Sequence, residues 1–137
     1  MTRPKLLKGD AREVLKGLKD ESVQCVVTSP PYWGLRDYGS EGQLGLEETP
    51  EEYVENMVSV FQEVKRVLRK DGTVWLNLGD SYAGSGKGIG SEPDPKWQGA
   101  RYDEMKSRTD WKKMEGLKPK DLVGIPWRVA LALQADG

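Results

Sequence analysis

The sequence has no histidine and only one cysteine among its 137 residues. A lone cysteine cannot form a disulfide bond within the chain, and a zinc site built from cysteine and histidine is excluded because it needs more of these ligands. A mechanism that requires a histidine base is excluded within the chain as well. The chemistry must therefore come from carboxylates, hydroxyls, aromatic rings and backbone groups, and we expect no metal site.

Long apolar runs are also missing. No stretch approaches the roughly 20 apolar residues of a membrane-spanning helix, and the first residues, Met1–Lys5, lack the apolar segment of a signal peptide. We therefore expect a cytoplasmic protein that does not act at a membrane. The length, with 36% hydrophobic and 31% charged residues, suits one compact domain with a core.

The net charge is only −1, which is not the overall charge of a nucleic-acid-binding protein. The charges are unevenly distributed, however. Residues 39–63 contain seven Glu and no Lys or Arg, whereas residues 101–120 contain seven Lys or Arg and four Asp or Glu. A local basic stretch can hold phosphate groups even in a neutral protein, although the same pattern is also typical of a solvated loop.

The first part of the chain predicts a short strand, a helix and a second strand. Leu6–Leu7 is a short apolar start, and Asp10 can cap a helix whose apolar residues share one face. Residues Val23–Thr28 are β-rich and mostly apolar, as expected of a strand buried in a parallel sheet. Cys25 lies inside this strand, so we interpret it as a buried structural thiol and not as a nucleophile.

A second helix is predicted to begin at Thr49, with Pro50 at its first position and Glu52 three residues after the cap. Its apolar residues form one stripe: Tyr53, Val54, Met57, Val58, Phe61, Val64, Val67 and Leu68. Gly72 is expected just past the end of this helix. Thr73–Leu78 is predicted to form the next strand.

Residues 81–116 are rich in Gly, Ser, Pro, Lys and Asp, and they predict a long flexible loop, which at this length is usually functional or disordered. Residues 117–137 return to helix, which begins or kinks near Pro126. The alternation of strands and helices predicts parallel βαβ units and an α/β fold. Because strands buried on both faces need more than three neighbours, we expect the chain to be part of a larger fold.

The segment Thr28–Trp33, which reads Thr-Ser-Pro-Pro-Tyr-Trp, directly follows a predicted strand, where ligands bind in doubly wound sheets. Ser29 offers a hydroxyl oxygen, and Pro30 a carbonyl held by the rigid Pro-Pro backbone. Two acceptors aimed at the hydrogens of an exocyclic amine would draw its nitrogen toward tetrahedral geometry and free the lone pair. Tyr32 offers a flat face for a base swung out of the duplex. The turn could therefore prepare an amine to attack a methyl group by positioning alone.

Two other interpretations of this turn are possible. Proline-rich turns with aromatic residues are common in proteins, and such a segment can also be recognised by a partner as polyproline. The apolar strand before the turn and the Gly9-Asp10 pair upstream favour the catalytic interpretation.

These residues resemble a known family. Thr28–Tyr32 looks like the catalytic motif of the amino-directed DNA methyltransferases, which read Asp/Asn/Ser-Pro-Pro-Tyr/Phe. Leu7–Ala11 and Asp20–Val27 resemble the segments before this motif in the permuted subgroup whose catalytic half comes first. Leu68–Asp80 and Lys120–Ala130 resemble the later strand and helix, so the resemblance covers nearly the whole chain.

The resemblance implies an α/β, Rossmann-like class I methyltransferase fold that is partial, with residues 1–137 as the catalytic half of a mostly parallel sheet. It implies S-adenosylmethionine as cofactor, with Asp10 at its adenine end and with Ser29 and Pro30 also in contact with it. Double-stranded DNA is the implied substrate. The implied catalytic residues are Ser29, Pro30, Pro31 and Tyr32.

The family's second cofactor element, a Phe-x-Gly-x-Gly loop, is not in the sequence. In the permuted order it would lie after Gly137, beyond the target-recognition region, most of which is also absent. The remainder of a methyltransferase chain is therefore an expected partner, and we expect the isolated chain to be inactive.

The serine at position 29 bears on the target base. Ser-Pro-Pro-Tyr is more typical of cytosine-N4 enzymes and Asp-Pro-Pro-Tyr of adenine-N6 enzymes, so the resemblance favours cytosine N4. Because a serine hydroxyl can accept a hydrogen bond from either amine, adenine N6 is an alternative. A non-catalytic DNA-binding fragment is another.

Residues near the motif are further candidates. Trp33, Arg36 and Tyr38 are predicted to line the base pocket or to touch a phosphate, with plain packing as the alternative. Asp80 could reach the pocket or cap a turn. Gly84–Gly88 misses the spacing of phosphate-binding and dinucleotide-binding loops. Three aromatic residues interleaved with Lys and Arg are candidates for base stacking: Trp97, Tyr102 and Trp111.

Overall fold

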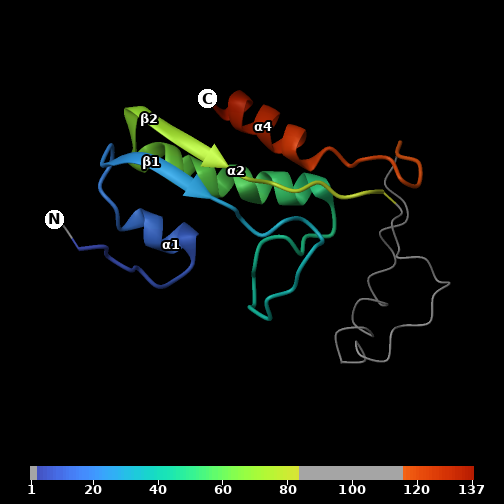
Figure 1. Ribbon diagram of the computed structural model, residues 1–137, viewed down its shortest axis with the longest axis horizontal. Helices are drawn as coiled ribbons and strands as arrows, with labels where there is room; N and C mark the ends of the chain where they lie inside the picture. Colours follow the sequence, from blue (N-terminus) through green and yellow to red (C-terminus); the bar gives the residue numbers. More distant parts are fainter. Residues whose placement is uncertain (1–2, 84–115) are drawn as a thin grey trace. The chain divides into compact units, whose positions relative to one another are not determined.

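The computed structural model describes residues 3–83 and 116–137. The chain divides into two compact units, one made of residues 1–79 and 125–137 and the other of residues 80–124. The first unit contains every helix and strand of Figure 1: α1 (Ala11–Lys16), β1 (Val23–Thr28), α2 (Pro50–Val67), β2 (Leu68–Leu76) and α4 (Ile125–Asp136).

Strands β1 and β2 are parallel neighbours, and α2 is the crossover between them. The register places Val26 beside Val74 and Thr28 beside Leu76, so both strands end at the same edge of the sheet. This βαβ unit confirms the predicted α/β class with parallel strands. The bounds of β1 are those that the sequence predicted.

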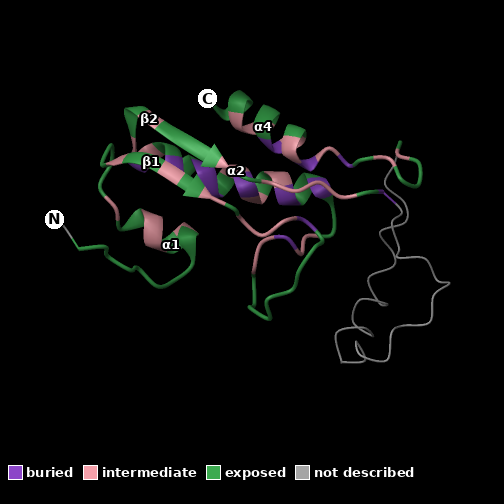
Figure 2. Cartoon of the chain, viewed as in Figure 1, coloured by how far each residue is buried: buried purple, intermediate pink, exposed green. Residues whose placement is uncertain are grey.

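Helix α2 begins where its sequence predicts. Thr49 Oγ1 accepts a hydrogen bond from the Glu52 amide at 3.2 Å, and the Glu52 carboxylate accepts one from the Thr49 amide at 3.4 Å, which completes a capping box. The helix buries one stripe, shown in purple in Figure 2: Pro50, Tyr53, Met57, Val60, Phe61, Val64 and Val67. This stripe forms most of the core of the first unit.

The end of α2 differs from the prediction. The helix ends at Val67, and Leu68 is already extended because it pairs with Val23 as the first residue of β2. The register then moves from Leu68 to Thr73 while β1 advances only from Val23 to Cys25, so the four residues between bulge out of the ladder. Gly72 lies in this bulge and not at the helix end. The pairing of Leu68 with Val23 therefore ends the helix at Val67, before Gly72.

Helix α1 is capped by Asp10, whose Oδ1 accepts the Arg12 amide at 2.8 Å. Arg66 of α2 holds the other end of α1, because its guanidinium donates to the carbonyls of Leu15 at 2.8 Å and Leu18 at 3.0 Å. The same guanidinium pairs with Glu63 at 2.8 Å and with Asp20.

Helix α4 lies beside α2 and runs in the same direction (Figure 1). Arg128 near its start pairs with Glu51 at 2.6 Å, and Asp136 at its end accepts a hydrogen bond from Gln62 at 2.9 Å. Ile125 and Val129 are its buried residues. The helix begins one residue before Pro126, a position that proline tolerates well because early helical amides lack partners within the helix.

Two expectations about burial and one about a strand were wrong. Val27 and Trp75 are 78% and 66% exposed. The described helices therefore cover only one face of the two strands. Cys25 shares the open face with Val27 and is exposed, not buried. Leu6 is 98% exposed, and Leu6–Leu7 does not pair with a strand among the described residues. The sheet formed by the described residues therefore has two strands, β1 and β2.

In the second unit, Tyr82 and Leu122 form an antiparallel bridge, and the Val123 amide donates to the Ser81 carbonyl at 2.8 Å. The predicted flexible loop over residues 81–116 lies largely outside the described residues. No helix of the described ranges is long and apolar enough to cross a membrane.

Thr49→Ala should lower the free energy of unfolding by about 1 kcal/mol, because the Glu52 amide loses its side-chain acceptor. Thr49→Ser, which keeps the hydroxyl, should retain most of the stability. Urea unfolding followed by circular dichroism measures both. Equal stability of the Ala variant and the unaltered chain would show that the capping box does not contribute.

Asp10→Asn keeps a cap acceptor and removes a charge. The Arg12 side chain, through its hydrogen bonds, lowers the pKa of Asp10 from 3.8 to about 2. The stabilising contribution is therefore complete above pH 3.8 and is lost as the pH falls through 2. We expect at most about 1 kcal/mol at pH 7, since the carboxylate is nearly half exposed and water screens the pair.

The stability difference between the Asp10→Asn variant and the unaltered chain should shrink when urea unfolding is repeated below pH 4. A difference that is the same at pH 3 and pH 7 would contradict this assignment.

Candidate functional site

The predicted catalytic turn, Ser29 to Trp33, follows directly on the carboxyl end of β1. Ser29 is exposed, and of the residues that the structure describes only Tyr32 has a polar atom near its hydroxyl, with 3.5 Å between the two oxygens. No donor in the described parts of the chain reaches the Pro30 carbonyl. The turn thus carries two oxygen acceptors that the described part of the chain leaves largely unused.

Tyr53 of α2 connects the core to this turn. Its side chain is fully buried, and its hydroxyl donates a hydrogen bond to the Pro31 carbonyl at 2.9 Å. Burial, with smaller contributions from Glu47 and Tyr32, raises the pKa of Tyr53 well above its ordinary value. The phenol therefore stays protonated and remains a donor over the whole physiological pH range.

The loop between the turn and α2 folds back onto the turn at Gly45. The Gly34 amide donates to the Gly45 carbonyl at 2.8 Å. Gly45 has φ +91°, and a Cβ there would lie 2.8 Å from the Tyr32 carbonyl oxygen and 3.2 Å from Pro31 Cβ. A glycine is therefore needed both for its backbone conformation and for the close approach.

Glu47 holds this loop through three contacts. Its carbonyl accepts the indole N–H of Trp33 at 3.1 Å, and its carboxylate accepts the Gly45 amide at 2.8 Å and the Asn56 side chain at 3.0 Å. Trp33 is only 2% exposed. The predicted base-pocket residue Trp33 thus lies in the core, where it anchors the turn.

The ring of Tyr32 lies against Gly79, three residues after the end of β2. A Cβ on Gly79 would come within 2.7 Å of Tyr32 Cδ2 and 2.9 Å of Cε2. The Asn77 amide continues the pairing of the two strands by donating to the Thr28 carbonyl at 3.0 Å. The absence of a side chain at Gly79 therefore leaves room for the aromatic ring.

Asp10, the predicted cofactor residue, lies at the amino end of α1. Its carboxylate pairs with the Arg12 guanidinium, with Arg12 Nε 3.0 Å from Oδ1 and Nη2 2.6 Å from Oδ2. Arg12 Nη2 also donates to the Gly42 carbonyl at 3.0 Å. Arg12 thereby links Asp10 to the same loop that folds back onto the catalytic turn.

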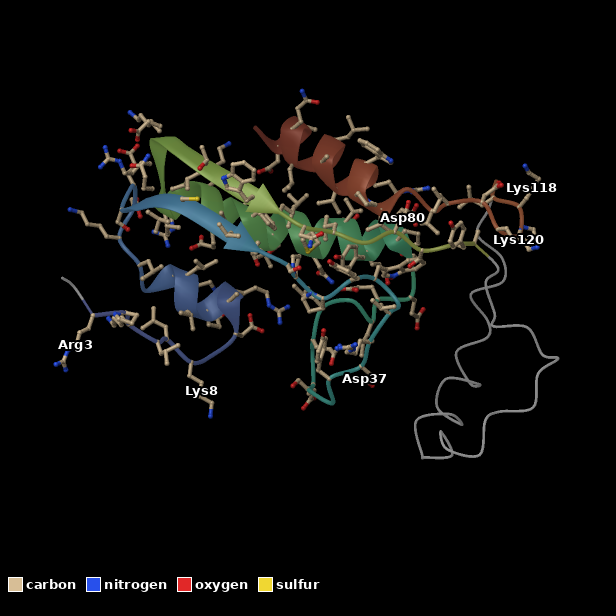
Figure 3. The ribbon with its side chains drawn as sticks, viewed as in Figure 1. Arg3, Lys8, Asp37, Asp80, Lys118 and Lys120 are labelled. Atoms are coloured by element: carbon tan, nitrogen blue, oxygen red, sulfur yellow. The ribbon has the colours of Figure 1, made fainter. Side chains whose placement is uncertain are left out.

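Arg36 and Tyr38, the other predicted substrate contacts, lie on the exposed part of this loop. The guanidinium of Arg36 is 6.0 Å from the centre of the Tyr38 ring. Gln43 holds the backbone around them, since its side chain accepts the Tyr38 amide at 2.7 Å and donates to the Arg36 carbonyl at 3.1 Å. Asp37, labelled in Figure 3, accepts the Gly39 amide at 2.7 Å.

Asp80 belongs to the second unit, and there it holds a turn. Its carboxylate accepts the amide of Ser81 at 2.8 Å and that of Gly124 at 3.0 Å. Lys118 and Lys120 lie on the same bend of this unit (Figure 3), and Lys118 pairs with Asp121 at 3.5 Å. Trp97, Tyr102 and Trp111 lie outside the described residues, as do Gly84–Gly88.

The structure adds residues to the site that the sequence did not single out: Arg12, Gly45, Glu47, Tyr53 and Gly79. The helical stripe predicted Tyr53 only as a core residue. The hydroxyl of a buried tyrosine usually has a hydrogen-bond partner, and this is the signal that could have identified the residue. Gly45 and Glu47 lie in a Glu-rich stretch with no distinguishing pattern. Their roles depend on contacts with residues far away in the sequence.

Elsewhere in the first unit, an open hollow of about 750 Å³ lies near the amino ends of the strands. Its cations already have partners, since Arg66 pairs with Glu63 and Asp20, and Lys70 lies 3.8 Å from Glu21. No cluster of three or more His, Cys, Asp or Glu suited to a metal ion occurs in residues 3–83 and 116–137. The turn after β1 is therefore the candidate functional site.

Comparison with known proteins identifies the family of the chain. Type II methyltransferase M.SmaI from Serratia marcescens is 51% identical over 133 residues, which are 97% of this chain and 44% of that protein. M.XycI from Xanthomonas campestris pv. cyanopsidis is 54% identical and M.Cfr9I from Citrobacter freundii 52%, each over 132 residues, 96% of this chain and 42% of the relative.

The chain thus spans less than half the length of these relatives. No solved structure matches it with statistical significance. A family model described as DNA methylase, of the N6/N4 type, matches residues 23–136, which include the turn and most of its supports. The chain therefore belongs to the N6/N4 family of DNA methylases.

Proposed function

We propose that the chain is the catalytic half of a Rossmann-like class I DNA methyltransferase of restriction–modification type. The enzyme moves a methyl group from S-adenosylmethionine to the exocyclic amine of a base flipped out of double-stranded DNA. The observation that carries the proposal is the turn after β1, where Ser29 Oγ and the Pro30 carbonyl are available acceptors on a firmly held backbone.

The two acceptors suit an amino group. An exocyclic amine has two N–H donors, and its lone pair is delocalised into the ring of the base. Ser29 and Pro30 accept one hydrogen each, which draws the nitrogen toward tetrahedral geometry and makes its lone pair available. Among the described residues, the Pro30 carbonyl accepts no hydrogen bond, and the Ser29 hydroxyl has only its 3.5 Å contact with the Tyr32 hydroxyl.

Tyr32 stacks on the flipped base in this proposal. Its ring is half-buried and lies against Gly79, so its orientation is limited before any base arrives. Stacking on such a ring contributes about 1–3 kcal/mol per base and does not depend strongly on the identity of the base. Arg36 and Tyr38, on the exposed loop, would contact the DNA beside the flipped base.

Asp10 contacts the adenine end of S-adenosylmethionine in this proposal. Arg12 uses three acceptor positions of the carboxylate, and about four exist on an ionised carboxylate. The lowered pKa keeps the group ionised, and one position on Oδ2 is left for a ligand donor. The residues present therefore fit the cofactor, which supplies an electrophilic methyl group on a sulfonium when bound.

Cytosine N4 is the proposed target atom and adenine N6 the alternative. The support for cytosine is the Ser-Pro-Pro-Tyr motif, in which Ser29 replaces the Asp that is more typical of adenine enzymes. Mass spectrometry of nucleosides from methylated DNA distinguishes the two products directly.

A chimera can test the proposal, because the chain matches 44% of the Serratia marcescens relative. In the chimera this chain replaces the matched segment of M.SmaI, and M.SmaI itself is the control. Transfer of tritiated methyl groups to DNA is the measurement. A folded chimera without methyl transfer, beside an active control, would overturn the proposed function.

Ser29→Ala in the chimera should lower the rate of methyl transfer by about 100-fold, because one of two positioned hydrogen-bond partners is lost. The matched control is Ser59→Ala on the exposed side of α2, which should leave the rate unchanged. An ordinary rate for the Ser29 variant would show that this hydroxyl does not orient the amine.

Tyr32→Phe should keep most of the activity, because it retains the aromatic ring and loses only a long contact to Ser29. Tyr32→Ala should reduce methyl transfer by at least about tenfold, since stacking is lost. Methyl-transfer rates of both chimeras measure this order. Equal rates for the two variants would argue against the stacking role.

A further inference from the structure

Two consecutive prolines, Pro30 and Pro31, form the centre of the catalytic turn. Neither Pro30 nor Pro31 has an amide hydrogen, so their carbonyl oxygens are the only backbone groups that can be held by hydrogen bonds. Of these, the Pro31 carbonyl accepts the Tyr53 hydroxyl at 2.9 Å, and the Pro30 carbonyl has no donor among the described residues. The described residues thus hold the Pro31 carbonyl and leave the Pro30 carbonyl available.

The two carbonyls are mechanically coupled. The Pro30–Pro31 peptide is planar, and the ring of Pro31 locks its own φ near −65°. The Pro30 carbonyl is therefore rigidly attached to the Pro31 ring, and only the ψ rotation of Pro31 separates it from the next carbonyl. A hydrogen bond that fixes the Pro31 carbonyl removes this last freedom.

We propose that Tyr53 is a positioning residue for methyl transfer, which sets the direction of the Pro30 carbonyl through its hydrogen bond to the Pro31 carbonyl. The inference rests on the proposed function. Tyr53 does not touch the base or the cofactor in this scheme. It acts from a fully buried position on a long helix, where its own side chain has little freedom.

A second set of contacts supports the turn from the same helix. Asn56 lies three residues after Tyr53, and its side chain donates to Glu47 at 3.0 Å. Glu47 accepts the Gly45 amide, and Gly45 packs closely on Pro31 and the Tyr32 carbonyl. The first turns of α2 therefore support the catalytic turn both directly and through the loop.

The experiment compares Tyr53→Phe with the unaltered chain in the M.SmaI chimera. The change removes one oxygen atom and keeps the buried ring. We expect kcat to fall about tenfold while KM for DNA and for S-adenosylmethionine changes less than about twofold, because misplacement affects the reacting geometry more than binding.

The matched control is Val64→Ala, which removes apolar volume from the same buried stripe roughly three turns further along α2. Circular dichroism and urea unfolding establish that both variants are folded at the assay temperature. The control should lose stability and keep kcat. This comparison separates positioning from a general loss of stability.

An unchanged kcat for Tyr53→Phe, or an equal fall of kcat for Val64→Ala, would overturn the inference and leave the proposed function standing. A rise in KM with kcat unchanged would overturn it as well. Absence of methyl transfer from the chimera with the unaltered chain counts against the proposed function itself, and the inference then fails with it.

Discussion

The site depends on one constraint: two consecutive prolines must present their carbonyl oxygens, although neither residue has an amide hydrogen. Pro30 and Pro31 make the turn stiff and at the same time deprive it of donors. The carbonyls of the two prolines can be held only by groups that donate to them or pack against them. The buried phenol of Tyr53 provides the donor, and the backbone at Gly45 provides the close contact.

The same supports connect the two proposed sides of the reaction. The loop before α2 contacts the catalytic turn at Gly45 and receives the Arg12 guanidinium at Gly42. Arg12 in turn pairs with Asp10, the proposed cofactor contact. Because the chain has no histidine, the proposed reaction depends on where its acceptor groups are held. The loop before α2 connects the proposed cofactor contact, Asp10, to the catalytic turn.

Features encoded by neighbouring residues could be predicted from the sequence. Asp10 and Thr49 were identified as helix caps, and the bounds of β1 followed from its apolar run and the prolines after it. Each of these depends on residues within a few positions, where capping and turn chemistry decide the structure. The Ser-Pro-Pro-Tyr motif was recognised on the same local basis.

Features that depend on distant residues could not be predicted. Helix α2 ends at Val67 because Leu68 pairs with Val23, and no local signal marks that pairing. Cys25 was expected to be buried because its strand is apolar, but burial depends on what covers the sheet, and here one face is open. In the same way, Tyr53 was predicted only as one residue of an apolar helical stripe, and the stripe did not indicate the hydrogen bond to the Pro31 carbonyl.

Helix α2 passes into β2 without a loop, since Leu68 is both the cap of the helix and the first residue of the strand. The helix therefore fixes the direction in which the Tyr53 side chain points about the helix axis, relative to strand β2. Insertion or deletion of one residue between them would turn the phenol by about 100° and shift it by about 1.5 Å along the axis. The spacing from Tyr53 to Leu68 should consequently tolerate substitutions far better than changes in length.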